Sequence, residues 1–335
     1  MKKLILSSIL LSSLLGAMSF SVFAADKLVV YSARNEQLIK HVFDAYRNET
    51  GTDISFITDK AAPLLVRLKA EGKRTPADVL ITVDAGNLWK AEQDGVLQPL
   101  DSKILNKNIP ASLRDPENNW FGMSVRARTI VYHPGRVKSS ALSTYEALAD
   151  PKFKGRLCLR TSKKVYNQSL VAMLIARHGE VKTEAIVKGW VANLATKVFS
   201  NDTSVMKAIT AGQCDIGIVN TYYYGRLLKK DPGIELKLFW PNQKTHGVHV
   251  NISGAAVTRY SKHKVAAQKF LEWLSGPTAQ RLFADSNMEY PANKNVPANR
   301  IVQSWGKFKQ DDMNLVQAGK LQAKAVMLMD RAGYK

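Results

Sequence analysis

The chain has 335 residues, a formal net charge of +20 and only two cysteines. A chain of this length exceeds what one compact core usually serves, so we expect two lobes. Lysine and arginine are spread along the chain and no nucleic-acid-binding motif is present, so a nucleic-acid partner is not expected. The charge predicts a generally basic surface.

Residues 1–24 have the pattern of a secretory signal peptide. Two lysines precede an apolar and serine-rich run (4–15), and residues 22–24 (VFA) supply the cleavage positions. The run is short for a membrane span, and no cysteine follows it to carry a lipid anchor. We therefore expect a periplasmic protein that begins near Ala25.

Strand-like and helix-like segments alternate from residue 27 onward. KLVVYSA (27–33) is typical of a buried strand, and Asn35 is the expected N-cap of a helix that ends at Gly51. Two more strands and one helix follow: DISFITD (53–59), PLLVRLKAEG (63–72) and ADVLITV (77–83). This alternation predicts an α/β lobe with a mainly parallel sheet.

A second set of alternating segments begins after about residue 126. The expected strands are TIVYH (129–133), GRLCLR (155–160) and DIGIVN (215–220), and the expected helices are 167–179, 183–195 and 203–212. VHVNISGAAVT (248–258) is then strand-like, 264–276 and 278–285 are helical, and the tail from 300 is helical and polar. No linker separates the two sets, which predicts lobes joined by crossing strands with a ligand in the cleft between them.

The segment VNTYYYGR (219–226) holds three consecutive tyrosines. Neighbouring residues of a helix point about 100° apart, so two can share one ligand only where the helix begins at a cleft edge. Asn220 is a good cap residue, which places Tyr222 and Tyr223 at a helix start. Tyr224 is rotated further and is expected to pack inside its lobe.

Several segments together resemble the periplasmic ferric-iron-binding proteins of bacterial ABC importers, a branch of the class II solute-binding proteins. They are YSARNEQLIKHVFDAYRNETG, PADVLITVDAGNLWKAEQDGVL, YEALADPKFKGRLCLRTS, NTYYYGR and AAQKFLEWLSGPTAQRLFADSNMEYPAN, and they recur in the family's order over roughly residues 26–300. The resemblance implies a two-lobe α/β periplasmic binding protein, the type II Venus flytrap, with two crossing hinge strands. Its N-terminal lobe would comprise 25–126 and 252–298, and its C-terminal lobe 127–251 and 299–335.

The family's tyrosine motifs fall on Tyr166, Tyr222 and Tyr223 of this chain. Tyr166 is expected to stand just before a helix capped by Asn167. Phenolate is a hard anionic donor, and highly charged cations prefer oxygen ligands. A bound metal would displace the phenol proton, and three phenolates would cancel the charge of a ferric ion.

The first lobe of this chain departs from many family members. The place of a family histidine reads YSARNEQ, with Asn35 and Glu36, so a direct metal ligand from this lobe is in doubt. Members that lack it hold a synergistic anion such as carbonate, and the matching arginines are Arg34 and Arg126. An arginine fork suits a planar bidentate anion, although either residue alone could form an ordinary salt bridge. Of the two arginines in RAR (126–128), Arg128 is the one expected to have a structural role.

The cysteines and histidines are weaker signals. Cys158 and Cys214 form an even pair in an oxidising compartment, which predicts one disulfide, with two buried thiols as the alternative. His246 and His249 are spaced like a metal pair, but positions three apart on a strand face opposite sides.

The sequence leaves three alternative functions. The first is a monomeric binding protein that carries ferric iron to an ABC importer permease in the inner membrane. The second is a protein of the same fold for a small oxyanion or another small solute, which Arg34 and Arg126 would suit. The third is a secreted enzyme, for which the sequence offers no nucleophile, zinc or phosphate-loop motif.

Overall fold

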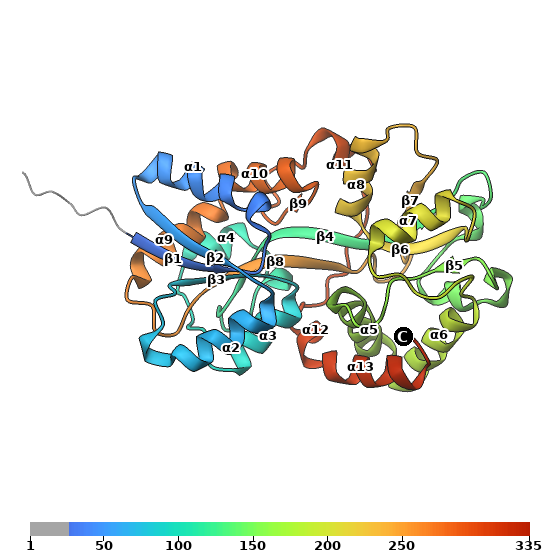
Figure 1. Cartoon of the computed structure of the whole chain (residues 1–335), viewed down its shortest axis with the longest axis horizontal. Helices are drawn as coiled ribbons and strands as arrows, with labels where there is room; N and C mark the ends of the chain where they lie inside the picture. The colour runs from blue at the N-terminus through green and yellow to red at the C-terminus, as the bar shows by residue number, and fades with distance from the viewer. Residues whose placement is uncertain (1–26) are drawn as a thin grey trace, which may run out of the picture.

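The computed structural model describes residues 27–335, so the predicted signal peptide and Ala25 lie outside the described residues. Two lobes lie along the longest axis of the molecule, and long strands run from one to the other (Figure 1). This two-lobe α/β architecture confirms the fold expected from the sequence. Within residues 27–335, no helix is long and apolar enough to cross a membrane.

The first lobe is built on a parallel core of strands, as the alternation predicts. β1 (Lys27–Ser32) pairs in parallel with both β2 (Asp53–Thr58) and β3 (Val79–Val83), and β8 (Val250–Val257) joins β3 in the antiparallel sense. The helices of this lobe are α1 (Lys40–Thr50), α2 (Ala61–Glu71), α3 (Ala85–Gln93), α4 (Lys103–Asn108), α9 (Lys264–Leu274) and α10 (Pro277–Asn287).

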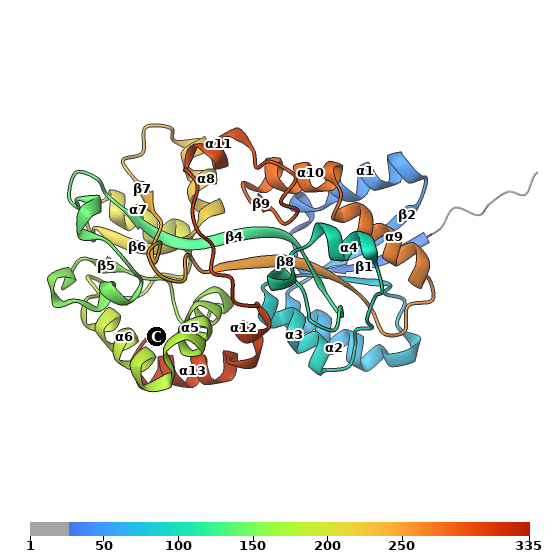
Figure 2. The ribbon, with the colours of Figure 1, turned by 180° about the vertical axis from the view of Figure 1, so that it is seen from behind.

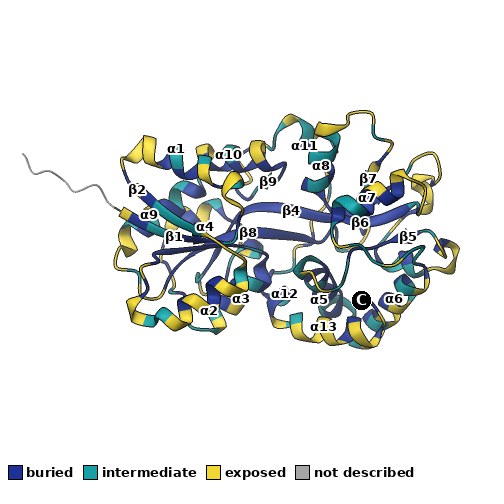
Figure 3. Ribbon diagram, viewed as in Figure 1, coloured by how far each residue is buried: buried dark blue, intermediate teal, exposed yellow. Residues whose placement is uncertain are grey.

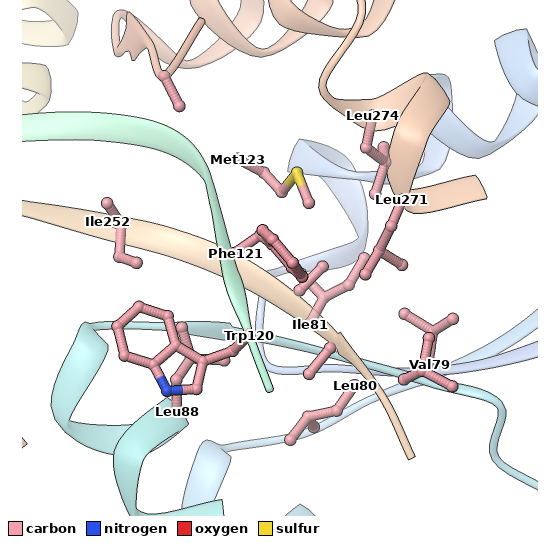
Figure 4. Packing of buried hydrophobic residues seen from close by; sticks show 14 of the residues in the cluster. Val79, Leu80, Ile81, Leu88, Trp120, Phe121, Met123, Ile252, Leu271 and Leu274 are labelled. Carbon is pink, nitrogen blue, oxygen red and sulfur yellow. The ribbon is translucent and has the colours of Figure 1, made fainter. Parts of the chain in front are cut away.

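One continuous apolar core fills the first lobe. Trp120 and Phe121 lie fully buried against side chains of β3, β8, α3 and α9 (Figure 4). Because β3 is covered on both sides, its residues VLITV form an apolar run rather than an alternating one.

The second lobe surrounds a shorter sheet. Its strands are β5 (Leu157–Cys158), β6 (Ile216–Asn220) and β7 (Lys237–Phe239), and its helices are α5 (Val165–His178), α6 (Glu180–Ala192), α7 (Asp202–Thr210) and α8 (Thr221–Lys230). Two separate core clusters flank this sheet, and Cys158 is bonded to Cys214 within one of them, with their Cα atoms 6.0 Å apart.

Two hinge strands, β4 (Phe121–Tyr132) and β8, connect the lobes and pair with each other (Figure 1). Every residue of β4 is buried, and the central strands form the least exposed part of the molecule (Figure 3). β4 begins eight residues before the strand predicted at 129–133. The sequence hid this extension because Arg126 and Arg128 interrupt the apolar pattern with charges that are paired inside the protein.

The C-terminal segment contacts both lobes. It leaves α11 (Arg300–Ser304), passes behind the hinge strands and continues into α12 (Val316–Lys320) and α13 (Gln322–Arg331), as Figure 2 shows. Leu315 and Val316 belong to the first-lobe core, whereas Leu328 and Met329 of α13 pack in the second. The chain therefore crosses between the lobes by this route as well as by the hinge strands.

The helix start predicted at Asn35 was wrong. A 3-10 turn occupies Glu36–Leu38, and α1 begins only at Lys40 because Ile39 leaves helical geometry with φ −130°. Asn35 precedes the turn without a side-chain capping bond. The other 3-10 turns are Gly72–Arg74, Ala111–Leu113, Ser139–Ala141, Glu146–Ala149 and Pro151–Phe153, and β9 (Tyr290–Pro291) pairs with β4.

Candidate metal and anion site

A cavity of about 140 Å³ lies between the lobes, beside the hinge strands. The second lobe lines it with the side chains of Tyr166, Tyr222, Tyr223 and Arg226, and Arg126 of β4 closes one wall. Of the described tyrosines, these are the three that the sequence selected as donors, so the fold brings residues 166, 222 and 223 into one place. A larger hollow of about 760 Å³ behind the hinge contains none of them.

Tyr222 and Tyr223 lie in the first turn of α8, as expected. Their ring centroids are 4.4 Å apart and Tyr222 is buried. Asn220 precedes the helix, but its side chain does not cap it. Instead, Asn220 accepts a hydrogen bond from Arg128 (3.1 Å) and donates one to the Tyr222 hydroxyl (3.3 Å), so it orients a phenol rather than the helix backbone.

Tyr166 reaches the cavity from α5. The helix begins at Val165 and its N-cap position is Lys164, so Tyr166 lies inside the first turn and the predicted cap at Asn167 was wrong. Asn167 is buried and donates hydrogen bonds to the Arg160 carbonyl and to the Tyr334 hydroxyl, both at 2.8 Å. These bonds fix the start of α5 and with it the position of Tyr166.

Tyr224, which the sequence places inside its lobe, and Tyr31 both lie elsewhere. Tyr224 donates from its hydroxyl to the Leu236 carbonyl (3.1 Å) and packs edge-on against Trp305. Tyr31 donates to Glu71 of the first lobe (2.8 Å). Neither lines the cavity, so the three adjacent tyrosines of the YYY run differ in environment.

Three arginines surround the phenol rings. Arg126 and Arg160 lie 5.6 and 5.1 Å from the Tyr166 ring centroid, and Arg226 lies 5.0 Å from that of Tyr222. Such contacts are attractive for a neutral ring and become stronger if the phenol ionises. Sequence reasoning missed Arg160 and Arg226. Position 226 is four residues after 222, and this helical spacing could have revealed its neighbour.

Arg34 and Arg126, the predicted anion-binding residues, both line the cavity but differ in their partners. Arg34 forms a buried salt bridge with Glu289 (3.0 Å) and donates to Ser253 (2.5 Å). Arg126 has its Nη2 atom 3.8 Å from Asp84, and among the described residues this buried nitrogen has no hydrogen-bond partner. Arg34 also leaves a buried nitrogen, Nε, without a hydrogen-bond partner among the described residues, but its guanidinium is the more closely ion-paired of the two.

Burial in the cavity favours the protonated form of two of its phenols, Tyr166 and Tyr222. Burial raises the pKa of Tyr166 above its ordinary value, and the nearby Arg126 only partly opposes this. Burial raises the pKa of Tyr222 still further, assisted by the neighbouring phenols. A ligand that needs phenolates must therefore displace the protons itself.

A buried network supports the second-lobe side of the cavity. Arg128 donates to Asn167 (3.0 Å) and pairs with Asp202 (3.1 Å), which also faces Arg160 at 3.4 Å. Asp202 further accepts from the Asn220 backbone (2.9 Å). Arg128 is thus a structural arginine, and the network ties the starts of α5 and α8 together.

The histidines and carboxylates do not form a competing centre. Among residues 27–335 there is no group of three or more His, Cys, Asp or Glu side chains arranged to hold a metal. His249 is fully buried, and burial lowers its pKa to about 3. His246 lies instead beside His178, with ring centroids 6.0 Å apart. The tyrosine cavity is therefore the described site whose donors suit a hard cation.

The family model, the related sequences and the solved structures all point to bacterial solute-binding proteins. Residues 74–314 match the model of the bacterial extracellular solute-binding protein family. The chain is 44% identical over 312 residues to iron uptake protein A1 of Synechocystis, covering 91% of this chain and 87% of the relative. Iron- and citrate-bound FutA of Trichodesmium superposes with a TM-score of 0.89 at 44% identity, over 92% of this chain and all of that one.

A second solved structure has the same architecture. Ferric iron-binding protein A of Mannheimia haemolytica, in an open conformation, gives a TM-score of 0.87 at 39% identity over 92% of this chain and 99% of its own. These relatives are binding proteins of iron transport and not enzymes, which agrees with the absence of catalytic motifs in the sequence. The chain therefore belongs to the bacterial extracellular solute-binding proteins, in the branch that resembles the ferric-iron-binding proteins of ABC import systems.

Proposed function

We propose that this protein binds ferric iron in the periplasm and delivers it to the permease of an ABC importer. The metal ligands are the phenolates of Tyr166, Tyr222 and Tyr223. The observation that carries the proposal is the convergence of these three side chains, from two helix starts, in one cavity of about 140 Å³. The iron-related relatives described above support the same function.

The donor chemistry favours a trivalent hard cation. Phenolate oxygen is hard and anionic, and three phenolates neutralise a ferric ion, which a buried site requires. A softer divalent ion would favour thiolate or imidazole ligands, and no suitable cluster exists among the described residues. The pKa values of Tyr166 and Tyr222 are raised by burial, so the metal must replace protons, and acid should release it.

The positive side chains supply a place for a synergistic anion such as carbonate. Arg126 is the principal anion-binding residue in this proposal because its Nη2 atom has no hydrogen-bond partner in the described protein. Arg34 contributes less, since it pairs with Glu289 at 3.0 Å, whereas Arg126 lies 3.8 Å from its carboxylate neighbour Asp84. The anion would occupy the coordination positions that the first lobe leaves open at Asn35 and Glu36, and the protein would work as a monomer.

Visible absorption tests this assignment directly. Iron-loaded protein should show a phenolate-to-iron charge-transfer band, and the combined change Tyr222→Phe and Tyr223→Phe should abolish it together with ferric affinity. Tyr224→Phe is the matched control, because it removes a neighbouring hydroxyl that bonds to Leu236 outside the cavity. A band that survives the double change unaltered would sink the assignment.

The same experiment distinguishes ferric binding from the alternative function, the binding of a small oxyanion. Arg126 and Arg226 would bind an oxyanion without any metal, and the protein would then be colourless with ferric salts. Carbonate or phosphate alone would raise its melting temperature. Ferric binding predicts instead that carbonate alone has little effect and acts only together with iron.

A further inference from the structure

We propose that Asp84 is a positioning residue that couples the two lobes to the anion position. Its carboxylate joins the first lobe, both hinge strands and α5, and so sets Arg126 and Tyr166 relative to each other. The inference rests on the proposed function, because it assigns a role at the same iron and anion site.

Asp84 lies where β3 ends and α3 begins. Its backbone has φ 77° and ψ 128°, a conformation that residues with a side chain rarely adopt. The side chain is completely buried, and the backbone N–H donates to the Ile252 carbonyl of β8 (2.8 Å). A strained residue persists where its surroundings over-determine it, and such residues cluster at functional sites.

The carboxylate bridges elements with different cores. Oδ1 accepts from the Gly86 backbone of α3 (3.0 Å) and from the Ser169 hydroxyl of α5 (2.7 Å). Ala85, adjacent to Asp84, packs in the first-lobe core, whereas Leu170, adjacent to Ser169, packs in the second. The bond to Ser169 therefore crosses between lobes. It ends three residues, about one turn, after Tyr166 on the same helix.

The other oxygen faces the hinge strands. Oδ2 accepts from the Asn251 side chain of β8 (2.9 Å) and lies 3.8 Å from Arg126 Nη2 on β4. All four neighbours of the carboxylate are donors, and α3 adds the positive end of its dipole. Burial raises the pKa of Asp84 above its ordinary value, while Arg126 and the donors Ser169, Gly86 and Asn251 oppose this and favour the charged form. Asp84 thus partly compensates the guanidinium that is proposed to bind the anion.

These contacts give Asp84 two separable effects. Its negative charge competes with an external anion for Arg126, which weakens anion binding and eases release. Its hydrogen bond to Ser169 holds α5, and hence Tyr166, against the first lobe. Asp84→Asn removes the charge and keeps a polar side chain of the same shape, whereas Ser169→Ala removes the cross-lobe bond and keeps the charge.

The test uses the mature protein loaded with ferric ion in carbonate-free buffer and titrated with bicarbonate while the visible band is recorded. Asp84→Asn should lower the bicarbonate midpoint by about tenfold, because a charge near the guanidinium is lost. Ser169→Ala should leave the midpoint within about twofold but speed iron loss to excess EDTA about fivefold, the expected effect of one hydrogen bond.

Two controls separate these effects from general destabilisation. Asp115→Asn removes a different buried carboxylate, and Ser102→Ala removes a buried serine whose bonds stay within the first lobe. Both should leave the midpoint and the EDTA rate at wild-type values. Thermal unfolding confirms that each variant is folded at the assay temperature.

The outcomes distinguish this inference from the proposed function. A wild-type protein without the iron band would overturn both. A normal band with an unchanged bicarbonate midpoint in folded Asp84→Asn would overturn the charge role alone, and an unchanged EDTA rate in Ser169→Ala would overturn the lobe-coupling role. Should Asp84→Asn not fold, Asn251→Ala provides a second route, because freeing Oδ2 for Arg126 should raise the bicarbonate midpoint.

Discussion

The two sides of the central cavity differ in what they offer a ligand. The second lobe contributes three phenols from the starts of α5 and α8, which the buried network around Asp202 holds together. The first lobe contributes Arg34 with its partner Glu289, the Ser253 hydroxyl, and apolar or amide side chains such as Leu38 and Asn35. In the proposed function, all protein ligands of the metal come from one preassembled lobe, and the other lobe closes over it.

The lobes also differ in how they are stabilised. The first has one continuous core, whereas the second divides its core into separate clusters around a short sheet and adds the disulfide Cys158–Cys214. The second lobe has buried charges and polar helix starts near the ligand cavity, so fewer of its side chains are available to form an apolar core. The disulfide and the ion pairs around Asp202 compensate for the smaller apolar core.

The largest effect is expected from Asp202→Ala. This change leaves Arg128 and Arg160 buried without their carboxylate, which should destabilise the protein by about 3–5 kcal/mol. Urea unfolding followed by tryptophan fluorescence measures the loss. Asp215→Ala is the control in the same lobe, because that carboxylate pairs with the more exposed Arg136 and Arg156 and should cost clearly less. Equal losses would contradict the special role of the buried network.

Replacing both Cys158 and Cys214 by serine should cost about 4 kcal/mol, from the entropy of closing a loop of 56 residues in the unfolded chain. The same urea titration measures it. Dithiothreitol should lower the stability of the wild type toward that of the variant and leave the variant unchanged. The visible iron band should survive in the folded variant, because neither sulfur lines the cavity.

Acid should lower the free energy of unfolding of the protein through His249, the residue just before hinge strand β8. Burial lowers its pKa to about 3 in the folded protein, while the unfolded value is about 6.5. The unfolded chain binds the extra proton, so this contribution is complete above pH 6.5 and declines as the pH falls toward 3. By pH 4.5 the loss should be about 3 kcal/mol. His249→Gln should flatten this part of the stability profile, and a profile as steep as the wild type would refute the assignment.

Part of the candidate site follows from local sequence signals, whereas Tyr166, Arg34 and Arg126 were expected from the family resemblance. Two adjacent tyrosines behind an asparagine predict donors at a helix start, and α8 begins at Thr221 as that reading requires. The regular elements of both lobes were also predictable, since apolar runs bounded by glycine and polar residues mark buried strands. Two errors fell where charges are buried: Arg126 and Arg128 hid the first half of β4, and Asn167 looked like a cap because its partner Arg128 is 39 residues away. The third, the helix start expected at Asn35, arose because a 3-10 turn precedes α1.

The sequence by itself determined the alternation of strands and helices and the types of side chain offered to a ligand, because each depends on neighbouring residues or on side-chain chemistry. Only the tertiary structure decided which polar groups meet. It separated Tyr224 from its two neighbours, paired Arg34 with Glu289 and left Arg126 with a free donor. It also placed Asp84 against Ser169, 85 residues away. The physical reason is that burial forces each charge and hydrogen-bonding group to find a partner, and the fold brings those partners together from distant parts of the chain.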